Sequence, residues 1–486
     1  MQTALSDRRW PVAFLLLVGA ALAPAAAWAK GPPPKVTPAV AEESAPSEPS
    51  GITALLAAAD DITRQVAALR GLEPRRPIAR GVLSRNQIGA KLKERIGKEY
   101  TPEEIRIESR VLKRLGLLPP EVDYKQLLID LLMEQVAGFY DPFARQLYIA
   151  DWLGLELQRP AMAHELQHAL QDQHFDLKAF ATPMKEDGDR QLARTALVEG
   201  DGTAVMLEFV AQSLGLDLSK VPNLTDSLGQ QLAAGAMNQS PVFNRAPRFL
   251  RETLLFPYFA GMKFVYVLRS EAKKGSSSWS RVNDAFKNPP DSTEQVMHPE
   301  KFINREKPMI VTAAPVPALA PQKELRRDVL GELEFRVLFA SRLADGTADK
   351  AAEGWGGDRL VAYGETSEED KPVCLIDLSA WDSEEDAKQA TSALRALVAR
   401  QIGRSEPSPS VEPAVFEKDA EAWHVERRGS EVLAMFGVPA ATRTEIAEQV
   451  WSGWKVAQPK GAQSAGHGKR VAKTLSPDGV EANEAR

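Results

Sequence analysis

The sequence predicts an α+β fold in two parts, a mostly helical domain with a small sheet followed by a smaller α+β domain with an antiparallel sheet. Three observations lead to this prediction. Apolar residues recur at helical spacing from Ile52 onward. A stretch rich in Pro and Ala then interrupts the chain at residues 311–322. Beyond it, short strand-like segments alternate with helical ones. The 486 residues, 44% hydrophobic and 26% charged, are enough for more than one buried core.

The beginning of the chain has the three-part pattern of a secretory signal peptide. Arg8 and Arg9 precede an apolar run from Val12 to Ala23, and an A-x-A-like cleavage site ends at Ala29. The alternative is an uncleaved membrane anchor, but the run is shorter than the ~20 apolar residues that span a bilayer. The arginine pair also fits a twin-arginine signal, although such pairs are common in signal peptides. The sequence therefore predicts an exported protein, periplasmic or extracellular, with no stable membrane span after signal removal.

Composition divides the rest of the chain. A segment rich in Pro, Ala, Ser and Glu follows the signal, and the chain ends in a polar, Gly-containing stretch, so both are expected to be disordered. The expected order is a signal peptide at 1–29, a disordered spacer at 30–50, a first domain at 51–310, a linker at 311–322, an accessory α+β domain at 323–457 and a disordered tail at 458–486.

The first domain is expected to be mainly helical. Thr101 before Pro102 is a typical helix start, and Gly116 is a typical helix end. An Asp-Pro turn between two β-prone pieces indicates a hairpin, and Pro160 is expected to open the helix after it. The expected elements are helices at about 101–116, 124–137, 161–175 and 190–214 and a hairpin at 138–150, followed by mostly helical structure over 222–300.

The second domain is expected to begin with a helix and to continue with strands. Ser383 followed by three acidic residues starts a helix, and an Arg-Gly-Ser turn joins the last two strands. The expected elements are helices at 324–343 and 383–401, strands at 359–365, 372–379, 421–428 and 431–437, and a last helix from about 442.

Charge and cysteine content exclude some classes of protein. The net charge is −6 with no dense basic block, so nothing indicates a nucleic-acid partner or an anionic membrane surface. The only cysteine is Cys374, and a single cysteine makes no internal disulfide. Because it lies in an apolar run, it is expected to be a buried, inert thiol rather than a catalytic one. The oligomeric state does not follow from the sequence.

The run His164-Glu165-Leu166-Gln167-His168 carries the main functional signal. Positions four apart on a helix lie on one face about one turn apart, so both imidazoles can reach one ion. Zinc bound in this way makes a water molecule acidic, and Glu165 beside it can act as the general base. The alternative is two unrelated surface or core histidines. The sequence predicts one zinc ion per chain, with His164 and His168 as ligands.

A catalytic zinc ion needs a third protein ligand, and two candidates compete. His174 lies ten residues after His164, but a continuous helix would place it ~15 Å along the axis. A sharp turn would be needed at Gln171, which is a good helix former. Glu199 is the other candidate, and glycines flank the Asp201 that follows it closely. Glycine destabilises the interior of a helix, so the two glycines suggest that this backbone comes close to the His164 helix or to the metal. Glu199 is therefore favoured, although its alternative role is an exposed glutamate near a kink.

Other residues are candidates for supporting roles. Metal-bound histidines usually donate their second ring N–H to a carboxylate, for which Asp172, Asp176 and Asp201 are available. Hydrolysis also needs a donor for the developing oxyanion, and His298 in a proline-bounded loop is the best candidate. A structural role in its loop is the alternative for His298.

Several segments together resemble a group of largely uncharacterised bacterial exported proteins with zincin-type signatures. They are residues 138–142, 164–177, 199–201, 293–295 and 298–301, with a further likeness at 354–359. The likeness covers most of residues 55–305. It implies a zinc-dependent peptidase of the gluzincin type with a zincin-like fold, in which His164, His168 and Glu199 hold the ion and Glu165 is the base. By analogy with zincins, residues 146–150 are expected to form an edge strand that a substrate peptide extends.

Two functions follow from these patterns. The first is an exported zinc metallopeptidase acting on proteins or peptides, and the intact Glu165 favours it. The second is a non-catalytic exported zinc-binding or scaffold protein with a structural or decayed site. A structural zinc site is normally closed by four protein ligands, so the number of side chains around the ion discriminates between them. Hydrolysis of another amide, such as one in a cell wall, also stays open.

Overall fold

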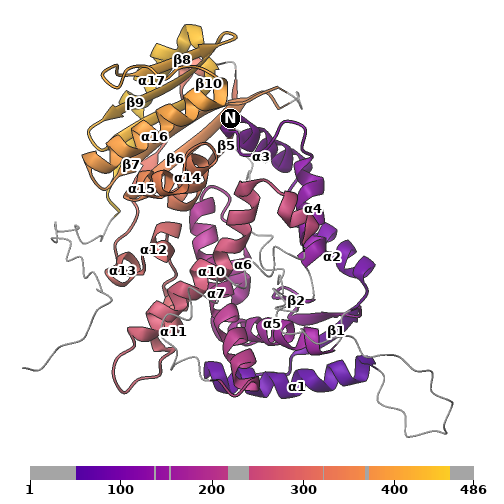
Figure 1. Ribbon diagram of the computed structural model, residues 1–486. Coiled ribbons are helices and arrows are strands. Elements are labelled where there is room, and N and C mark those ends of the chain that lie inside the picture. The colour runs from indigo at the N-terminus through magenta and orange to yellow at the C-terminus, as the bar shows by residue number, and fades with distance from the viewer. Residues whose placement is uncertain are drawn as a thin grey trace, which may run out of the picture.

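The protein consists of a helical part and a sheet-containing part that lie against each other (Figure 1). The computed structural model describes residues 51–135, 138–152, 155–216, 240–320, 322–366 and 371–459. The expected signal peptide and spacer lie outside the described residues, as does the expected tail beyond Pro459. The α+β class expected from the sequence is confirmed, with helices first and an antiparallel sheet towards the C-terminus.

The first part is built around two long helices, α7 and α10, which pack along each other in the centre of Figure 1. Helix α5 packs on α7, and α1 packs on both of them. The described helices of this part are α1 (Gly51–Arg70), α2 (Arg85–Glu99), α3 (Pro102–Leu115), α4 (Tyr124–Gln135), α5 (Leu155–Phe175), α6 (Leu177–Ala181), α7 (Gly188–Ser213), α9 (Pro241–Arg245), α10 (Arg248–Ser270), α11 (Ser280–Lys287), α12 (Thr293–Met297) and α13 (Pro299–Ile303).

Helix ends follow the local sequence in some places and depart from it in others. Thr101 and Glu104 form a capping box at the start of α3, and Gly116 ends that helix in the left-handed region at φ 75°. By contrast, α5 begins at Leu155, so the expectation that Pro160 opens this helix is wrong. A proline removes only one backbone hydrogen bond, and the tertiary packing of α5 outweighs that loss.

A small sheet lies beside α5. Its strands are β1 (Ala79–Leu83), β2 (Gly138–Asp141) and β3 (Gln146–Ala150), in the order β1-β3-β2. The hairpin of β2 and β3 agrees with the sequence, whereas β1, which pairs parallel with β3, was not expected. Strand β3 is therefore central, and the expectation that residues 146–150 form the edge is wrong. The edge strand that contacts α5 is β2.

The second part contains a six-stranded antiparallel sheet in the portion of the chain that the structure describes, with strand order β5-β6-β7-β10-β9-β8. Its elements are β5 (Lys323–Asp328), α14 (Gly331–Ala340), α15 (Asp345–Ala352), β6 (Trp355–Gly364), β7 (Cys374–Trp381), α16 (Glu384–Ile402), β8 (Ala414–Lys418), β9 (Glu421–Arg428), β10 (Glu431–Pro439), η4 (Ala440–Thr442), α17 (Arg443–Gly453) and β11 (Lys455–Ala457).

Both faces of this sheet are covered at its centre, which explains why β7 and β10 are buried along almost their whole length. Leu360 and Ala362 face the large core beneath α14 and α16, whereas Val361 and Tyr363 face a second core. Cys374 faces that second core, and burial raises the pKa of its thiol to about 12. The expectation of a buried thiol is thus confirmed.

The Pro/Ala-rich segment expected to be a linker belongs to the second core. Residues 310–312 form β4 (Ile310–Thr312), which pairs with β11, and η3 (Pro317–Leu319) contacts α17. Val311 and Leu319 are buried there. The segment differs from a free linker because its apolar side chains cover the second face of the sheet.

The expected helix over 324–343 is also partly wrong, since residues 323–328 form β5 and the helix begins only at Gly331. Charged residues of β5 have partners both far away and in the same strand: Arg326 pairs with Glu108 of α3 and with Asp328 of β5. Asp328 in turn accepts a hydrogen bond of 2.7 Å from the backbone N–H of Gly188, the first residue of α7. The second part therefore holds the start of α7.

One hydrophobic core runs through both parts, from Ile62 of α1 to Phe436 of β10. Helix α14 contacts α7, α10 and α12 as well as β6, so it joins the two parts. None of the described helices is both long and apolar enough to cross a membrane.

Candidate metal centre

Three donor atoms from two helices meet at one point of the first part. His164 Nε2 lies 3.0 Å from His168 Nε2 and 3.0 Å from Glu199 Oε2. His168 Nε2 lies 3.4 Å from the same carboxylate oxygen. All three side chains are buried, with 2% or less exposed. They are the His-His-Glu set expected from the sequence, and the structure brings them together.

Helix α5 supplies both imidazoles from one face. The rings of His164 and His168 pack edge to face, with centroids 4.6 Å apart. Leu166 and Leu170 on the same helix are fully buried and fix α5 in the core. The histidine pair at spacing four is therefore held on a rigid element, with both Nε2 atoms turned to the same place.

Helix α7 supplies Glu199, and two glycines let it come close. A Cβ on Gly202 would lie 2.9 Å from Cε1 of His164 and 3.1 Å from Cε1 of His168. Gly200 has a different role, because its Cβ would lie 2.1 Å from the carbonyl carbon of Gly261 on α10. The glycines around Asp201 thus permit close approach, one to the imidazoles and the other to the neighbouring helix.

The arrangement fits a zinc ion. Tetrahedral zinc with bonds of about 2.0–2.1 Å keeps its ligand atoms about 3.3 Å apart, which is close to the separations between these donors. Glu199 Oε1 and Glu165 Oε1 are buried oxygens without a hydrogen-bond partner among the described protein groups. Buried acceptors of this kind are costly unless a cation or water satisfies them. Two imidazoles and a carboxylate are a donor set that zinc prefers.

Glu165 lies beside these donors and is held by the edge strand. Its Oε2 accepts a hydrogen bond of 2.7 Å from the backbone N–H of Tyr140 in β2. The hydroxyl of Tyr140 donates to Asp172, which also pairs with Arg76. Burial raises the pKa of Glu165, although the nearby histidines oppose this. A raised pKa suits a carboxylate that must take up a proton near neutral pH.

The charges of the metal-free centre depend on one another. Burial opposes the charged form of His168, but the Glu199 carboxylate outweighs it and raises the pKa of His168 to about 9. Burial likewise opposes the charged form of Glu199, but His168 and His164 outweigh it and lower the pKa of Glu199 to about 2. Without a metal, a proton on His168 is therefore the cation that balances Glu199.

This coupling predicts a pH dependence. Because the folded pKa of His168 is above its unfolded value of 6.5, its contribution to stability is full below pH 6.5 and is lost as pH rises through about 9. Zinc would take the place of that proton, so zinc-bound protein should not lose this contribution. We expect the difference in melting temperature between zinc-loaded and chelated protein to grow from pH 6.5 to pH 9. Thermal unfolding at several pH values measures it, and a constant difference would contradict the coupling.

The competing third ligand does not reach the centre. His174 Nε2 contacts the carbonyl oxygen of Glu73 at 2.8 Å, because α5 continues without a turn through Gln171. None of the three acids expected to orient a histidine bonds one directly. Asp172 instead accepts hydrogen bonds from Tyr140 and Arg76. Asp176 is the residue before α6, and its side chain makes no capping hydrogen bond there. Asp201 lies closer and binds Gln171.

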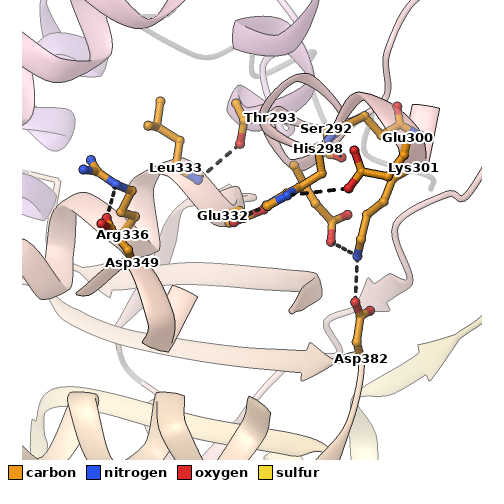
Figure 2. A network of polar contacts seen from close by, with 12 residues as sticks. Ser292, Thr293, His298, Glu300, Lys301, Glu332, Leu333, Arg336, Asp349 and Asp382 are labelled. Atoms are coloured by element: carbon orange, nitrogen blue, oxygen red, sulfur yellow. Dashed lines mark hydrogen bonds and ion pairs between the residues drawn. The ribbon is translucent and has the colours of Figure 1, made fainter. Parts of the chain in front are cut away.

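His298 is not brought to the centre, so its expected role as oxyanion donor is not supported. Its Nε2 lies 2.8 Å from Glu332 of α14, where the two parts of the protein meet (Figure 2). Thr293, at the start of the short helix that ends before His298, donates its backbone N–H to Asp189 near the start of α7. Asp189 lies ten residues before Glu199, which corresponds to about 15 Å along that helix. The loop histidine therefore serves the contact between the two parts.

A second group of acids close enough to hold a cation lies at the same contact. It consists of Glu294, Glu306 and Asp382. The Lys301 ammonium lies among them, 2.5 Å from Glu294, 3.0 Å from Glu306 and 2.6 Å from Asp382 (Figure 2 shows the contact with Asp382). Lys301 is thus the cation of this cluster, which connects α12 and α13 to the loop after β7.

Two residues near the centre were missed by sequence reasoning. Tyr258 of α10 is buried, and its ring centroid lies 6.0 Å from that of His164. Gln171 bonds the outer ring nitrogen of His168 at 2.8 Å. No motif marks Tyr258, because its position depends on the close packing of α10 against α7. Gln171 had a visible signal, since it lies three residues after His168 on the same helix face.

Comparison with known proteins covers only the second part of the chain. A family model described as a domain of unknown function, DUF8575, matches residues 319–447. No curated protein and no solved structure matches the chain. The matched residues run from η3 into α17 and do not include His164, His168 or Glu199.

Proposed function

We propose that the protein is an exported zinc-dependent metallopeptidase, with His164, His168 and Glu199 as the zinc ligands and Glu165 as the general base. The observation that carries the proposal is the convergence of three donor atoms within 3.4 Å of one another beside Glu165. Three protein ligands leave one position of a tetrahedral ion for water or substrate, as catalytic zinc sites require. When bound, zinc supplies Lewis-acid activation of a water molecule and of the scissile carbonyl.

Glu165 is suited to the proton transfers of peptide hydrolysis. Its Oε2 is fixed by Tyr140 N–H, while its Oε1 has no partner among the described protein groups. Oε1 is therefore the atom that takes the proton from the attacking water and later delivers it to the leaving amine. Tyr258 beside His164 replaces His298 as the candidate donor to the developing oxyanion.

The surroundings of β2 support a peptide substrate. A cleft of about 830 Å³ is lined by Phe139 and Asp141, which flank Tyr140, and by residues of α2 and of the 182–185 segment. Because β2 ends the strand order of the small sheet among the described residues, its outer edge can accept an extended peptide by β-augmentation. Tyr140, between these two lining residues, is the residue whose backbone N–H bonds Glu165.

A zinc site without catalysis is the second candidate, and the burial of the centre favours it. His164, Glu165, His168 and Glu199 are all 2% exposed or less, so a substrate needs an opening to reach them. A structural or decayed site in an exported scaffold protein needs no such opening. The presence of Glu165 argues against this alternative, because a structural zinc ion does not require a general base beside it.

Zinc-dependent cleavage tests the proposal. Purified full-length protein would be incubated with casein and with a mixed peptide library in three states: zinc-loaded, chelated, and chelated with zinc restored. We expect cleavage in the first and third states only, with new peptide termini identified by mass spectrometry. Stoichiometric zinc without any cleavage would favour the non-catalytic alternative. No zinc bound by the protein would contradict both. Fractionation of cells that express the chain tests the proposed export.

A further inference from the structure

The two ring nitrogens of His168 have different partners. Its Nε2 faces His164 Nε2 at 3.0 Å and Glu199 at 3.4 Å, whereas its Nδ1 lies 2.8 Å from Gln171 Oε1. A neutral imidazole carries one proton, and only the nitrogen without it has a lone pair for a metal. The group that holds the proton on Nδ1 therefore determines whether His168 can bind a metal through Nε2.

The amide of Gln171 can point in only one direction. Its Nε2 donates to Asp201 Oδ2 at 2.7 Å and to the carbonyl oxygen of Val198 at 3.1 Å. Both partners are acceptors, so a reversed amide would set its oxygen against two other oxygens. The amide oxygen must then face His168, and an oxygen acceptor there requires a proton on Nδ1.

Asp201 is itself fixed from the opposite side. Its Oδ1 accepts a hydrogen bond of 2.7 Å from Arg70 Nε, and both side chains are fully buried. The Arg70 guanidinium also stacks over Trp279, 4.4 Å from the ring centroid. Gln167 donates to the same Asp201 oxygen as Gln171, at 2.9 Å. The carboxylate thus has a guanidinium on one oxygen and two amides on the other.

We propose that the chain Arg70–Asp201–Gln171 is a relay that selects the metal-binding tautomer of His168. The relay places the proton of His168 on Nδ1 and leaves the lone pair of Nε2 directed at Glu199. Gln171 and Asp201 are then positioning residues that touch no substrate and no ion. The inference rests on the proposed function, because it assumes that His168 is a zinc ligand. Loss of such outer partners typically costs about 10–100-fold in metal affinity.

Neighbouring glutamines on α5 provide a matched comparison. Gln171→Leu removes the acceptor for His168 Nδ1 together with one bond to Asp201. Gln167→Leu removes one bond to the same Asp201 oxygen, but the Gln167 side chain does not bond His168, and its Oε1 has no partner among the described groups. Both variants leave the buried Arg70–Asp201 pair intact.

The test is the zinc dissociation constant of the full-length protein, measured by competition with a chromogenic chelator. We expect Gln171→Leu to bind zinc about 10–100-fold more weakly than wild type, and Gln167→Leu to stay within about threefold. In chelated wild type labelled with ¹⁵N-histidine, at a pH high enough for His168 to be neutral, long-range ¹H–¹⁵N correlations should show the single proton of His168 on Nδ1. That spectrum keeps the test valid if Gln171→Leu fails to fold.

Two results separate failure of the relay from failure of the proposed function. If wild type binds zinc but Gln171→Leu binds it as tightly as Gln167→Leu, or if the neutral His168 of the chelated protein carries its proton on Nε2, the relay is wrong and the zinc site stands. If wild type binds no zinc, the metal centre and the relay are both wrong.

Discussion

Glu165→Gln should leave zinc bound and lower peptide hydrolysis by about 10²–10⁴-fold, because general acid–base catalysis contributes roughly that factor. The amide keeps the size of the side chain but cannot take a proton from water. It can still accept the hydrogen bond from Tyr140 N–H that holds residue 165 against β2. Initial rates on a peptide found to be cleaved, together with zinc content by mass spectrometry, measure both halves of the prediction.

Asp172→Asn is the control for this substitution. Asp172 is a buried acid on the same helix and contacts Tyr140 and Arg76, but it does not contact the donor atoms. We expect it to change the rate by less than about tenfold, since it acts on Tyr140 and carries no proton in the reaction. Equal rates for Glu165→Gln and wild type would exclude Glu165 as the base.

Glu199→Gln should weaken zinc binding on the order of a hundredfold or more. The substitution keeps the shape of the side chain but replaces the anionic ligand with a neutral amide, which is a poor donor for zinc. The negative charge opposite the two imidazoles is lost as well. Chelator competition measures the dissociation constant, and thermal unfolding checks that the variant is folded.

His174→Gln is the matched control, because His174 was the other candidate for the third ligand. It contacts the carbonyl oxygen of Glu73 instead of the centre, so its replacement should leave zinc affinity unchanged within about threefold. The reverse pattern, with affinity lost in His174→Gln and kept in Glu199→Gln, would show that the ligands come from a different arrangement of α5.

The fold was predictable where local signals and burial agree. Ser383 accepts a hydrogen bond from Asp386 N–H at the start of α16, as its sequence indicates, and β9 occupies the expected residues 421–428. β5 could not be predicted in this way, because its charged residues are stabilised by Glu108 and Gly188, far away in sequence. The same holds for Pro160, which the packing of α5 accommodates inside the helix.

The centre was predictable for a similar reason. His164 and His168 are related by helix geometry alone, and the glycines beside Asp201 signalled the close approach of α7. His298 was misplaced because its partner Glu332 comes from the second part of the chain, and no local pattern tells which face of the protein a loop will meet. Gln171 was recognised only as a helix former, since its bonds to His168 and Asp201 need two helices in contact.

Anomalous diffraction across the zinc absorption edge, from crystals of the zinc-loaded full-length protein, would test the metal centre itself. The proposal predicts one anomalous peak about 2.0–2.2 Å from His164 Nε2, His168 Nε2 and a carboxylate oxygen of Glu199, with a fourth position open to water beside Glu165. The absence of a peak between these three side chains would contradict the zinc centre. A fourth protein ligand that closes the site would contradict catalysis.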